Sequence, residues 1–199
     1  MLFLIIIVDK CSRAKGTDGV MSQIKEIAAY WGTRAQGYSE RCKIDLIEDT
    51  KFDWLDKICK YAPAKQQLNV LDIGCGAGFF SILMAKAGHN VTSIDYTENM
   101  VNSAIQNAMD AGVDIEVLQM DAQNLDFEDD TFDLIVTRNV TWVMEQPTKA
   151  YSEWIRVLQP GGRMINFDEN QYLYLFDEDY KKEKERRGGE RVKRPLKRG

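Results

Sequence analysis

The pattern of apolar positions changes character along the chain. From Ser22 to Tyr38, and again from Ile44 to Ile58, apolar side chains recur every three or four residues, which predicts two amphipathic helices. After Pro63, short apolar runs alternate with helical segments instead. The runs that read as strands are 68–73, 90–95, 115–120, 132–138 and 163–167. Strands separated by helices predict an α/β fold, a doubly wound and mostly parallel sheet with helices on both faces.

Three helices are expected between these strands. The first covers residues 78–87, and the second follows Thr97, whose side chain can cap it, and ends at Gly112. The third begins near Pro147 and ends at the Pro-Gly-Gly of residues 160–162.

The first twenty residues read as an extension. Leu2 to Val8 is apolar but far shorter than the roughly 20 residues that cross a bilayer. No basic residue precedes the run and no small-residue cleavage site follows it, so it makes a poor signal peptide, and no membrane association is expected. A polar segment follows, and Met21 then opens the first helix. We therefore expect residues 1–20 to be dispensable.

The remaining chain divides by pattern into helical, sheet-forming and charged parts. The expected organisation is a domain over 21–178, with cap helices at 21–62 and a core at 68–168, followed by a charged tail at 179–199.

Composition and charge fit a globular protein. Apolar residues make up 44% and charged residues 29% of the chain, and the net charge of −5 argues against a general nucleic-acid binder. Residues 180–199 are the exception, with ten Lys or Arg against three Glu. Such a tail can contact RNA or an anionic membrane, or it can be a solvated helix; the sequence leaves both interpretations open.

The cysteines and the lone histidine indicate no metal site. Cys11, Cys42, Cys59 and Cys75 show neither close pairing nor metal-ligand spacing, which fits a reducing cytoplasm. Cys75 lies in a glycine loop but is expected to pack there, not to act as a nucleophile. His89 precedes the second strand, at the edge of the sheet opposite a ligand crevice, so it is not expected to act as a base.

The stretch NVLDIGCGAGFF from Asn69 is typical of a nucleotide-binding turn. Its glycines follow the first strand, where open parallel sheets bind ligands. The dinucleotide fingerprint G-x-G-x-x-G would need glycine at Phe79, which argues against a nicotinamide-dependent oxidoreductase. Asp95 ends the second strand, where a carboxylate can accept hydrogen bonds from both ribose hydroxyls. Asp72 and Asp121 make the strand ends acidic and favour a cationic ligand.

Four segments together resemble a known family. They are VLDIGCGAG at 70–78, VTSIDYTENMV at 91–101, MDAQNLDFEDDTFDLIVTR at 120–138, and VLQPGGRMINFD at 157–168. In this order and spacing they resemble the class I S-adenosylmethionine-dependent methyltransferases of the small-molecule group. The resemblance implies a Rossmann-like sheet of strand order 3-2-1-4-5, S-adenosylmethionine as cofactor, and in-line methyl transfer to a small acceptor.

The resemblance also assigns binding roles. The loop glycines would face the methionine part of the cofactor, Asp72 its ammonium group, and Asp95 the ribose. Residues beyond the second, third and fourth strands would contact the adenine and the methionine. The full cofactor-binding set is Tyr38, Asp72, Gly74, Gly76, Gly78, Asp95, Tyr96, Met100, Asp121, Ala122 and Asn139. Asp121 could instead form a turn with its own backbone.

The segment AYWGTRAQGY resembles the helix that covers the cofactor in this family. Tyr30, Arg34 and Tyr38 are the candidate lid residues, although Tyr30, Trp31 and Tyr38 could equally pack on an amphipathic helix.

The methyl acceptor is expected beyond the fourth and fifth strands. Trp142, Asp168 and Tyr172 are the candidate substrate-binding residues, because aromatic walls suit a flat or cationic small molecule. Tyr172 could instead cover the sheet. No Asn/Asp-Pro-Pro-aromatic signature follows the fourth strand, which argues against amino groups of nucleic acid or glutamine as acceptors. Neither the acceptor nor a general base can be named.

One departure from the family concerns the end of the fold. Such enzymes normally add a sixth strand and an antiparallel seventh beside the fifth, but only 32 residues follow Phe167 and the last twenty are mostly charged. We therefore expect this hairpin to be missing and strand 163–167 to be an exposed edge. Two alternatives follow: a truncated domain that binds the cofactor without activity, or a chain completed by a second copy in a homo-oligomer.

Overall fold

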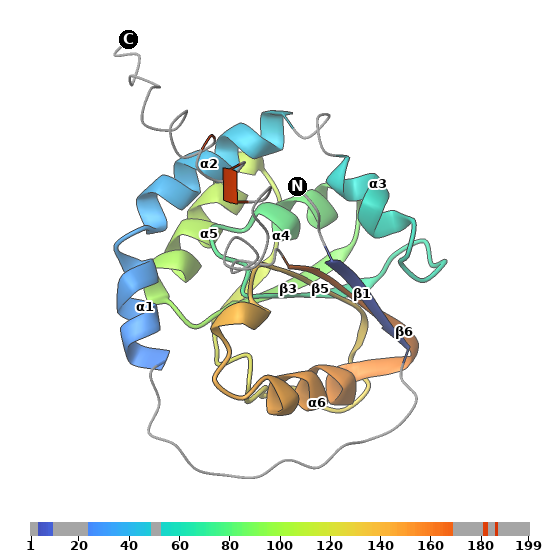
Figure 1. The fold of residues 1–199 in the computed structure, drawn as a ribbon. Coiled ribbons are helices and arrows are strands. Elements are labelled where there is room, and N and C mark those ends of the chain that lie inside the picture. Colours follow the sequence, from blue (N-terminus) through green and yellow to red (C-terminus); the bar gives the residue numbers. More distant parts are fainter. Residues whose placement is uncertain (1–3, 10–23, 49–52, 169–180, 183–185, 187–199) are drawn as a thin grey trace. The chain divides into compact units, whose positions relative to one another are not determined.

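The computed structural model describes residues 4–9, 24–48, 53–168, 181–182 and 186 (Figure 1). Residues 5–168 form one compact unit, and the other unit comprises residues 1–4 and 169–199. The helices are α1 (Ile24–Gly32), α2 (Ala35–Glu48), α3 (Trp54–Cys59), α4 (Phe79–Lys86), α5 (Glu98–Ala111), the 3₁₀ turn η2 (Thr141–Val143) and α6 (Pro147–Val157). The strands are β1 (Leu4–Asp9), β2 (Asn69–Ile73), β3 (Asn90–Asp95), β4 (Glu116–Gln119), β5 (Phe132–Arg138) and β6 (Leu158–Asp168). No helix in these ranges is long and apolar enough to cross a membrane.

The six strands form one sheet in the order β1-β6-β5-β2-β3-β4. β2 pairs with β3 and β5, β3 pairs with β4, and β5 pairs with β6, all in parallel. Leaving β1 aside, this is the expected order 3-2-1-4-5, so the predicted fold is confirmed. β2 is central and its residues Val70 to Ile73 are buried, which explains why its sequence is almost continuously apolar.

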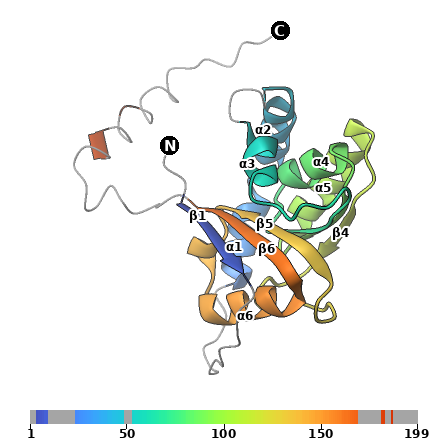
Figure 2. The same ribbon diagram turned by 90° about the vertical axis from the view of Figure 1, so that its right-hand side faces the viewer.

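Helices cover both faces of the sheet. α6 lies on one face, and α3, α4 and α5 lie on the other (Figures 1 and 2). The α6 face holds the main apolar cluster, which comprises Leu71, Ile73, Ile94, Leu125, Phe132, Ile135, Ala150, Trp154, Val157, Leu158 and Met164. On the opposite face the rings of Trp54, Phe80 and Phe167 pack edge to face, with centroids 5.2–5.5 Å apart.

The first predicted helix is broken in two. The hydroxyl of Thr33 donates to the carbonyl of Tyr30 at 2.8 Å, and the backbone N–H of Arg34 donates to the carbonyl of Trp31. These bonds end α1 in a tight turn, and α2 begins at Ala35. α2 then packs against α4 and α5, so the six residues Phe79 to Met84 of α4 are all buried.

β6 begins five residues earlier than expected. Leu158 already pairs with Phe132, and the register shifts before Arg163 pairs with Leu134. Gly161 lies within the strand at φ 79°, in the left-handed region that favours glycine. The Pro-Gly-Gly segment therefore forms an irregularity within the strand and not the end of the preceding helix that was expected, because α6 already ends at Val157.

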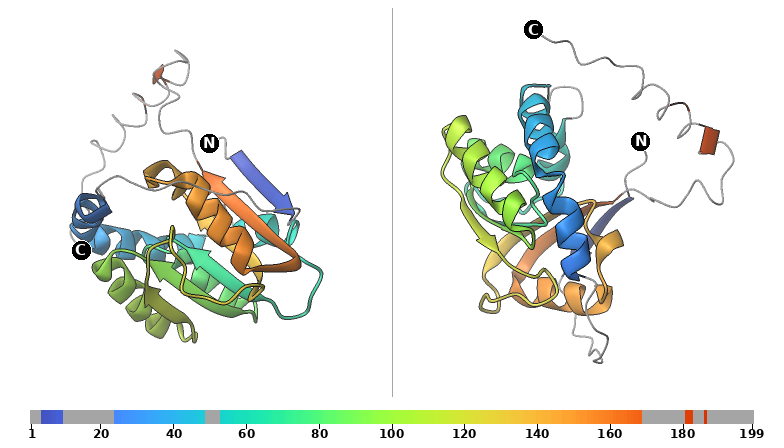
Figure 3. Two further views of the ribbon diagram at one scale, coloured as in Figure 1. Left: turned by 90° about the horizontal axis from the view of Figure 1, so that it is seen from below. Right: turned by 90° about the vertical axis from the view of Figure 1, so that its left-hand side faces the viewer.

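The fifth parallel strand is not the edge of the sheet, so that expectation is wrong. β1 lies beyond β6, and the arrows of the two strands point in opposite directions in Figures 1 and 3. β1 thus lies beside the fifth parallel strand, where the family resemblance places the antiparallel seventh strand. Its pairing also places part of the predicted extension in the sheet, although whether residues 1–20 are dispensable stays a prediction.

Candidate functional site

The glycine loop joins β2 to α4 at the carboxyl edge of the sheet. Gly74, Gly76 and Gly78 have φ values of 65°, 54° and 87°, which favour glycine at all three positions. The N–H of Cys75 donates to the carbonyl of Ile94 at 3.0 Å and ties the loop to β3. The loop is therefore a fixed part of the sheet edge.

The three glycines serve different purposes. A Cβ at Gly74 would lie 2.5 Å from Val140 Cγ2, and one at Gly78 would lie 3.2 Å from the Cβ of Ala104 in α5. A Cβ at Gly76 would meet no atom of the described chain within 4 Å. Gly74 and Gly78 thus allow close packing, whereas Gly76 faces open space in which a ligand can approach the backbone.

Asp95 joins the glycine loop to the start of α5. Its Oδ2 accepts a hydrogen bond from the N–H of Gly76 at 3.0 Å, and its Oδ1 accepts one from the N–H of Thr97 at 2.8 Å. Burial raises the pKa of this carboxyl, and the two backbone N–H groups oppose the shift. The structure thus brings Asp95 and Gly76 together. Thr97 is at the N-cap position of α5, as expected, but its side chain makes no capping hydrogen bond there, so that part of the expectation is wrong.

Asp72 lies beneath the loop and not in the open crevice. It is 2% exposed, and the hydroxyl of Ser81 donates to its Oδ2 at 2.6 Å. Burial raises its pKa to about 6, while Ser81 and Arg138 oppose the shift. Asp72 therefore anchors the first turn of α4, and it can act on a ligand through its charge.

Tyr96 and Met100 continue the site beyond β3. Met100 is buried in α5, and the carbonyl of Tyr96 accepts a hydrogen bond from Gln119 Nε2 at 3.0 Å. Tyr96 also lines a groove of about 440 Å³ that runs between α1 and the start of α5. Asn99 and Gly32 also line this groove, and Asn99 Nδ2 donates to the carbonyl of Gly32 at 3.2 Å.

Asp121 and Ala122 form a tight turn after β4. Asp121 Oδ1 accepts hydrogen bonds from the backbone and the side chain of Gln123, at 2.9 and 3.3 Å. None of the described hydrogen bonds uses its Oδ2. The predicted alternative of a turn at Asp121 is thus present, and it leaves one carboxylate oxygen to face a ligand. The N–H of Met120 donates to the carbonyl of Asp95 at 3.1 Å, so this turn lies next to the end of β3.

The loop after β5 is fastened to the end of β6. Asn139 has φ 58°, and the two oxygens of Asp168 accept hydrogen bonds from the N–H groups of Val140 and Thr141 at 2.9 and 3.1 Å. Burial raises the pKa of Asp168. Its carboxylate thus holds the loop beside Gly74, whereas the sequence suggested a contact with the substrate.

Four aromatic side chains gather where α1 and α2 meet this loop. The ring of Trp31 makes edge-to-face contacts with Tyr30, Tyr38 and Trp142, at centroid distances of 5.1, 5.5 and 6.2 Å. Tyr30, Tyr38 and Trp142 are 50%, 45% and 39% exposed. We call these four residues the aromatic cluster. Arg34, the other lid candidate, lies over the ring of Tyr30 at 4.6 Å. Tyr172 lies outside the described residues.

Sequence reasoning missed Arg138 at the end of β5. Its guanidinium lies 4.9, 5.2 and 5.5 Å from the ring centroids of Phe79, Phe80 and Trp54. Burial lowers its pKa, and the nearby charge of Asp72 opposes the shift. The only sequence signal is a lone arginine that ends an otherwise apolar strand.

Two residues are excluded from chemistry at the site. His89 Nδ1 accepts from the N–H of Leu68 at 3.4 Å, at the amino-terminal ends of β2 and β3, as expected. Burial raises the pKa of Cys75 well above its ordinary value, so its thiol stays neutral and packs in the loop.

Comparison with known proteins agrees with this geometry. Residues 71–166 match the family described as a methyltransferase domain. The chain is 28% identical to a ubiquinone biosynthesis O-methyltransferase of Pseudomonas fluorescens over 78% of its own length and 66% of that protein. It is 32% identical to the demethylmenaquinone methyltransferase of Bacillus subtilis over 59% of its own length and 52% of that protein. The chain thus spans less than two thirds of these curated relatives.

A solved structure shows the same fold. A SAM-dependent methyltransferase from Aquifex aeolicus superposes with a TM-score of 0.58 at 27% identity, over 69% of this chain and 72% of that one. Fold, loop and sequence similarity agree: the fold is that of the class I methyltransferases and residues 71–166 match a methyltransferase domain, which implies S-adenosylmethionine as the cofactor.

Proposed function

We propose that this chain binds S-adenosylmethionine along the carboxyl ends of β2, β3 and β4 and transfers its methyl group to a small molecule held beyond β5 and β6. The observation that carries the proposal is the carboxylate of Asp95, which is hydrogen-bonded to the N–H of Gly76 in a loop of three left-handed glycines. This arrangement supports the proposal, because a carboxylate that could accept from ribose hydroxyls lies beside an open stretch of backbone.

The cofactor would lie across the loop in a defined direction. Its methionine part would contact the backbone of Gly74 and Gly76. Its ribose hydroxyls would donate hydrogen bonds to Asp95, either in place of the N–H of Gly76 or in addition to it. Asp72 would attract the ammonium group from beneath the loop by charge. The adenine would lie between Tyr96 with Met100 on one side and the turn of Asp121 and Ala122 on the other.

Two further residues would border the methionine end. Asn139 would form the floor in its left-handed conformation, and Tyr38 would help to cover the crevice from α2.

The cofactor supplies a methyl group that its sulfonium makes electrophilic. The protein then needs to hold an acceptor atom about 3–3.5 Å from that methyl, in line with the departing sulfur, and to exclude water. We leave the group that would take a proton from the acceptor unassigned, because Asp168 already accepts two backbone hydrogen bonds.

We further propose that the acceptor is a flat aromatic ring that packs on the aromatic cluster. Exposed rings that already touch one another offer ring faces and edges against which another aromatic ring can pack at low entropic cost. The names of two relatives support this class, because one acts in ubiquinone biosynthesis and the other on demethylmenaquinone.

Calorimetric titration with S-adenosylhomocysteine, the demethylated product, tests the cofactor site. Asp95→Asn keeps the shape but loses the charge, so we expect affinity to fall about 10- to 100-fold, the effect of one charged hydrogen bond. An analogue without the ribose 2′-hydroxyl should bind wild type more weakly than the parent does, and the variant should not discriminate between the two.

Asp114→Asn, a change at an exposed carboxylate, is the matched control and should bind like wild type. A folded wild-type chain that binds no sulfur nucleotide would contradict the proposal, and binding of NADH in its place would favour an oxidoreductase. Binding without transfer to any acceptor would identify a cofactor-binding domain without activity.

A screen of catechols and hydroquinones, with S-adenosylhomocysteine release as the readout, tests the acceptor. Trp142→Ala should raise the acceptor KM about 3- to 10-fold through the lost ring contact, and cofactor affinity should not change. Met109→Ala, which removes an exposed apolar side chain from α5, is the control. An unchanged acceptor KM in Trp142→Ala would exclude the aromatic cluster as the acceptor surface.

We also propose a reducing, cytoplasmic location. Cys42, Cys59 and Cys75 are free thiols in the structure, which supports it. Fractionation of cells that express the chain tests the location.

A further inference from the structure

The turn at Asp121 and Ala122 is held by one helix, α6, at several points along its length. The side chain of Trp154 reaches from the core and donates through Nε1 to the carbonyl of Ala122 at 2.8 Å. At the start of α6 the N–H of Gln146 donates to Gln123 Oε1 at 2.7 Å. Since Gln123 Nε2 also donates to Asp121 Oδ1 at 3.3 Å, α6 is linked to that carboxylate through a single buried side chain.

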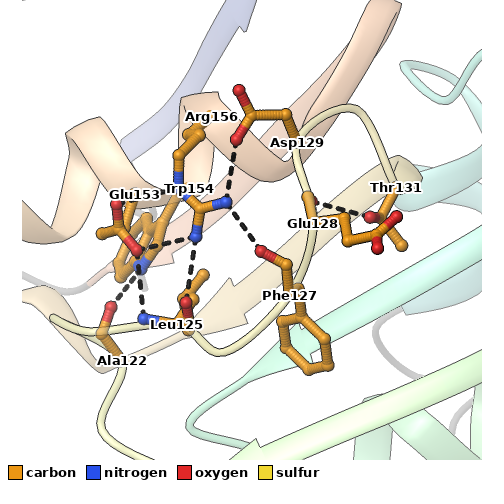
Figure 4. A network of polar contacts seen from close by, with 9 residues as sticks. All are labelled: Ala122, Leu125, Phe127, Glu128, Asp129, Thr131, Glu153, Trp154 and Arg156. Atoms are coloured by element: carbon orange, nitrogen blue, oxygen red, sulfur yellow. Dashed lines mark hydrogen bonds and ion pairs between the residues drawn. The ribbon is translucent and has the colours of Figure 1, made fainter.

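Further along the loop, Glu153 and Arg156 of α6 act together (Figure 4). Arg156 donates to the carbonyl of Leu125 at 2.9 Å and to that of Phe127 at 2.7 Å. It also pairs with Asp129 at 3.0 Å. Glu153 accepts from the N–H of Leu125 at 3.1 Å.

The guanidinium and the carboxylate also bond each other. Arg156 donates to Glu153 through Nε at 3.0 Å and through Nη2 at 2.8 Å. This is the planar two-point geometry that arginine provides and lysine cannot. Each partner orients the other, so the pair presents a rigid set of donors and acceptors to the loop.

These contacts fix backbone groups and not only side chains. Four of the bonds end on the carbonyls of Ala122, Leu125 and Phe127 or on the N–H of Leu125. β4, which precedes the loop, is a four-residue edge strand with no buried residue. The conformation of the loop therefore depends on α6 more than on the strand from which it leaves.

We propose that Arg156, Glu153 and Trp154 are positioning residues that set the selectivity of the site for adenine. The proposal rests on the proposed function, in which the turn at Asp121 and Ala122 reads the adenine edge. A hydrogen-bonding site rejects an analogue that lacks the matching group only when its donors and acceptors are held in place. α6 holds them from the opposite side of the loop and touches no part of the ligand.

The experiment compares the binding of two ligands, S-adenosylhomocysteine and its hypoxanthine counterpart, S-inosylhomocysteine. The two differ only at the adenine edge. Wild type should prefer the adenine compound by about 10-fold or more, as one lost hydrogen bond at a formed site implies. Arg156→Met removes every guanidinium bond and should reduce the preference to less than about 3-fold.

Two other variants keep the test decisive. Trp154→Phe keeps a smaller aromatic ring in the core and removes the bond to the carbonyl of Ala122, so it should reduce the preference at a moderate cost in stability and without loss of the fold. Lys149→Met makes the same type of change at an exposed cation of the same helix and should keep the wild-type preference.

All titrations are made well below the melting temperature of each variant, so that a purely structural effect would not change the ratio. If Arg156→Met and Trp154→Phe lower the melting temperature but retain the wild-type ratio, the positioning role is wrong. If wild type binds both ligands with equal affinity, the turn at Asp121 and Ala122 does not recognise the adenine edge, and the proposal is wrong. If wild type binds neither, the proposed function itself fails.

Discussion

Asp72→Asn should make the ligand-free protein more stable and the cofactor less tightly bound. The carboxyl is 2% exposed, and burial raises its pKa from 3.8 to about 6. Since one pKa unit corresponds to about 1.4 kcal/mol, holding this group charged at neutral pH costs the fold about 3 kcal/mol.

The sign of the pH dependence follows from the two states. Between about pH 4 and pH 6 the folded protein binds the proton and the unfolded chain does not, so the contribution of Asp72 to stability falls as pH rises through this window. Above about pH 6 the penalty is constant. Asparagine carries no charge and can still accept from Ser81, so the variant should lack this decline.

Urea unfolding of wild type and variant between pH 4 and pH 8 measures the effect. At pH 7.5 the variant should gain up to about 3 kcal/mol, which corresponds to about 6–12 °C in melting temperature for a domain of this size. At pH 4 the two proteins should differ little. Asp114→Asn is the control for loss of an exposed charge.

The same substitution, Asp72→Asn, should weaken binding of the cofactor. If the charge of Asp72 attracts the ammonium group, the variant should bind S-adenosylhomocysteine more weakly, whereas 5′-methylthioadenosine, which lacks the amino-acid part, should bind equally to both. A variant less stable than wild type at pH 7.5 would refute the reasoning, because the attraction of Asp72 for Arg138 would then outweigh the cost of its burial.

Three further changes test other features. Gly74→Ala should destabilise the fold by about 1–3 kcal/mol and abolish cofactor binding, because the new Cβ would lie 2.5 Å from Val140 Cγ2. Gly88→Ala is the control: it also has a positive φ, of 90°, but its Cβ would meet no atom of the described residues within 4 Å, so it should cost about 1 kcal/mol and leave binding intact. Asp133→Ala removes a buried acceptor of one ion pair and one backbone N–H, so thermal unfolding should show a loss of about 2–4 kcal/mol. Deleting residues 2–9 should leave cofactor affinity unchanged but expose the edge of β6, so light scattering should detect self-association. A monomeric product would show that β1 is not needed to protect the edge of β6 from pairing with another chain.

Much of the fold could be predicted because its signals are local. Apolar runs of five to seven residues between helical segments predicted strands β2 to β5 within about one residue of each end. The break at Thr33 and the early start of β6 were missed, because a side-chain cap and a strand partner overrode the periodic pattern. β1 was missed as a strand because its partner, β6, lies more than a hundred residues away in the sequence.

The same difference between local signals and contacts of distant segments applies to the residues of the candidate site. The glycine loop and Asp95 were found because each follows directly from a predicted strand end, and the structure joins them by a hydrogen bond. Trp154 lies in a predicted helix, but its bond to the carbonyl of Ala122 could not be anticipated from helical periodicity. The same holds for Arg138, since only the fold brings Phe79, Phe80 and Trp54 around it.

The position of β1 also bears on how the protein folds during synthesis. β1 leaves the ribosome before every other described strand, and β6, its neighbour in the sheet, leaves after all of them. Roughly 150 residues separate the two, which at typical elongation rates corresponds to about 10–30 s. Over that time the apolar segment of β1 has been synthesised but cannot yet pair with β6, so the sheet is completed only after all its other described strands have been made.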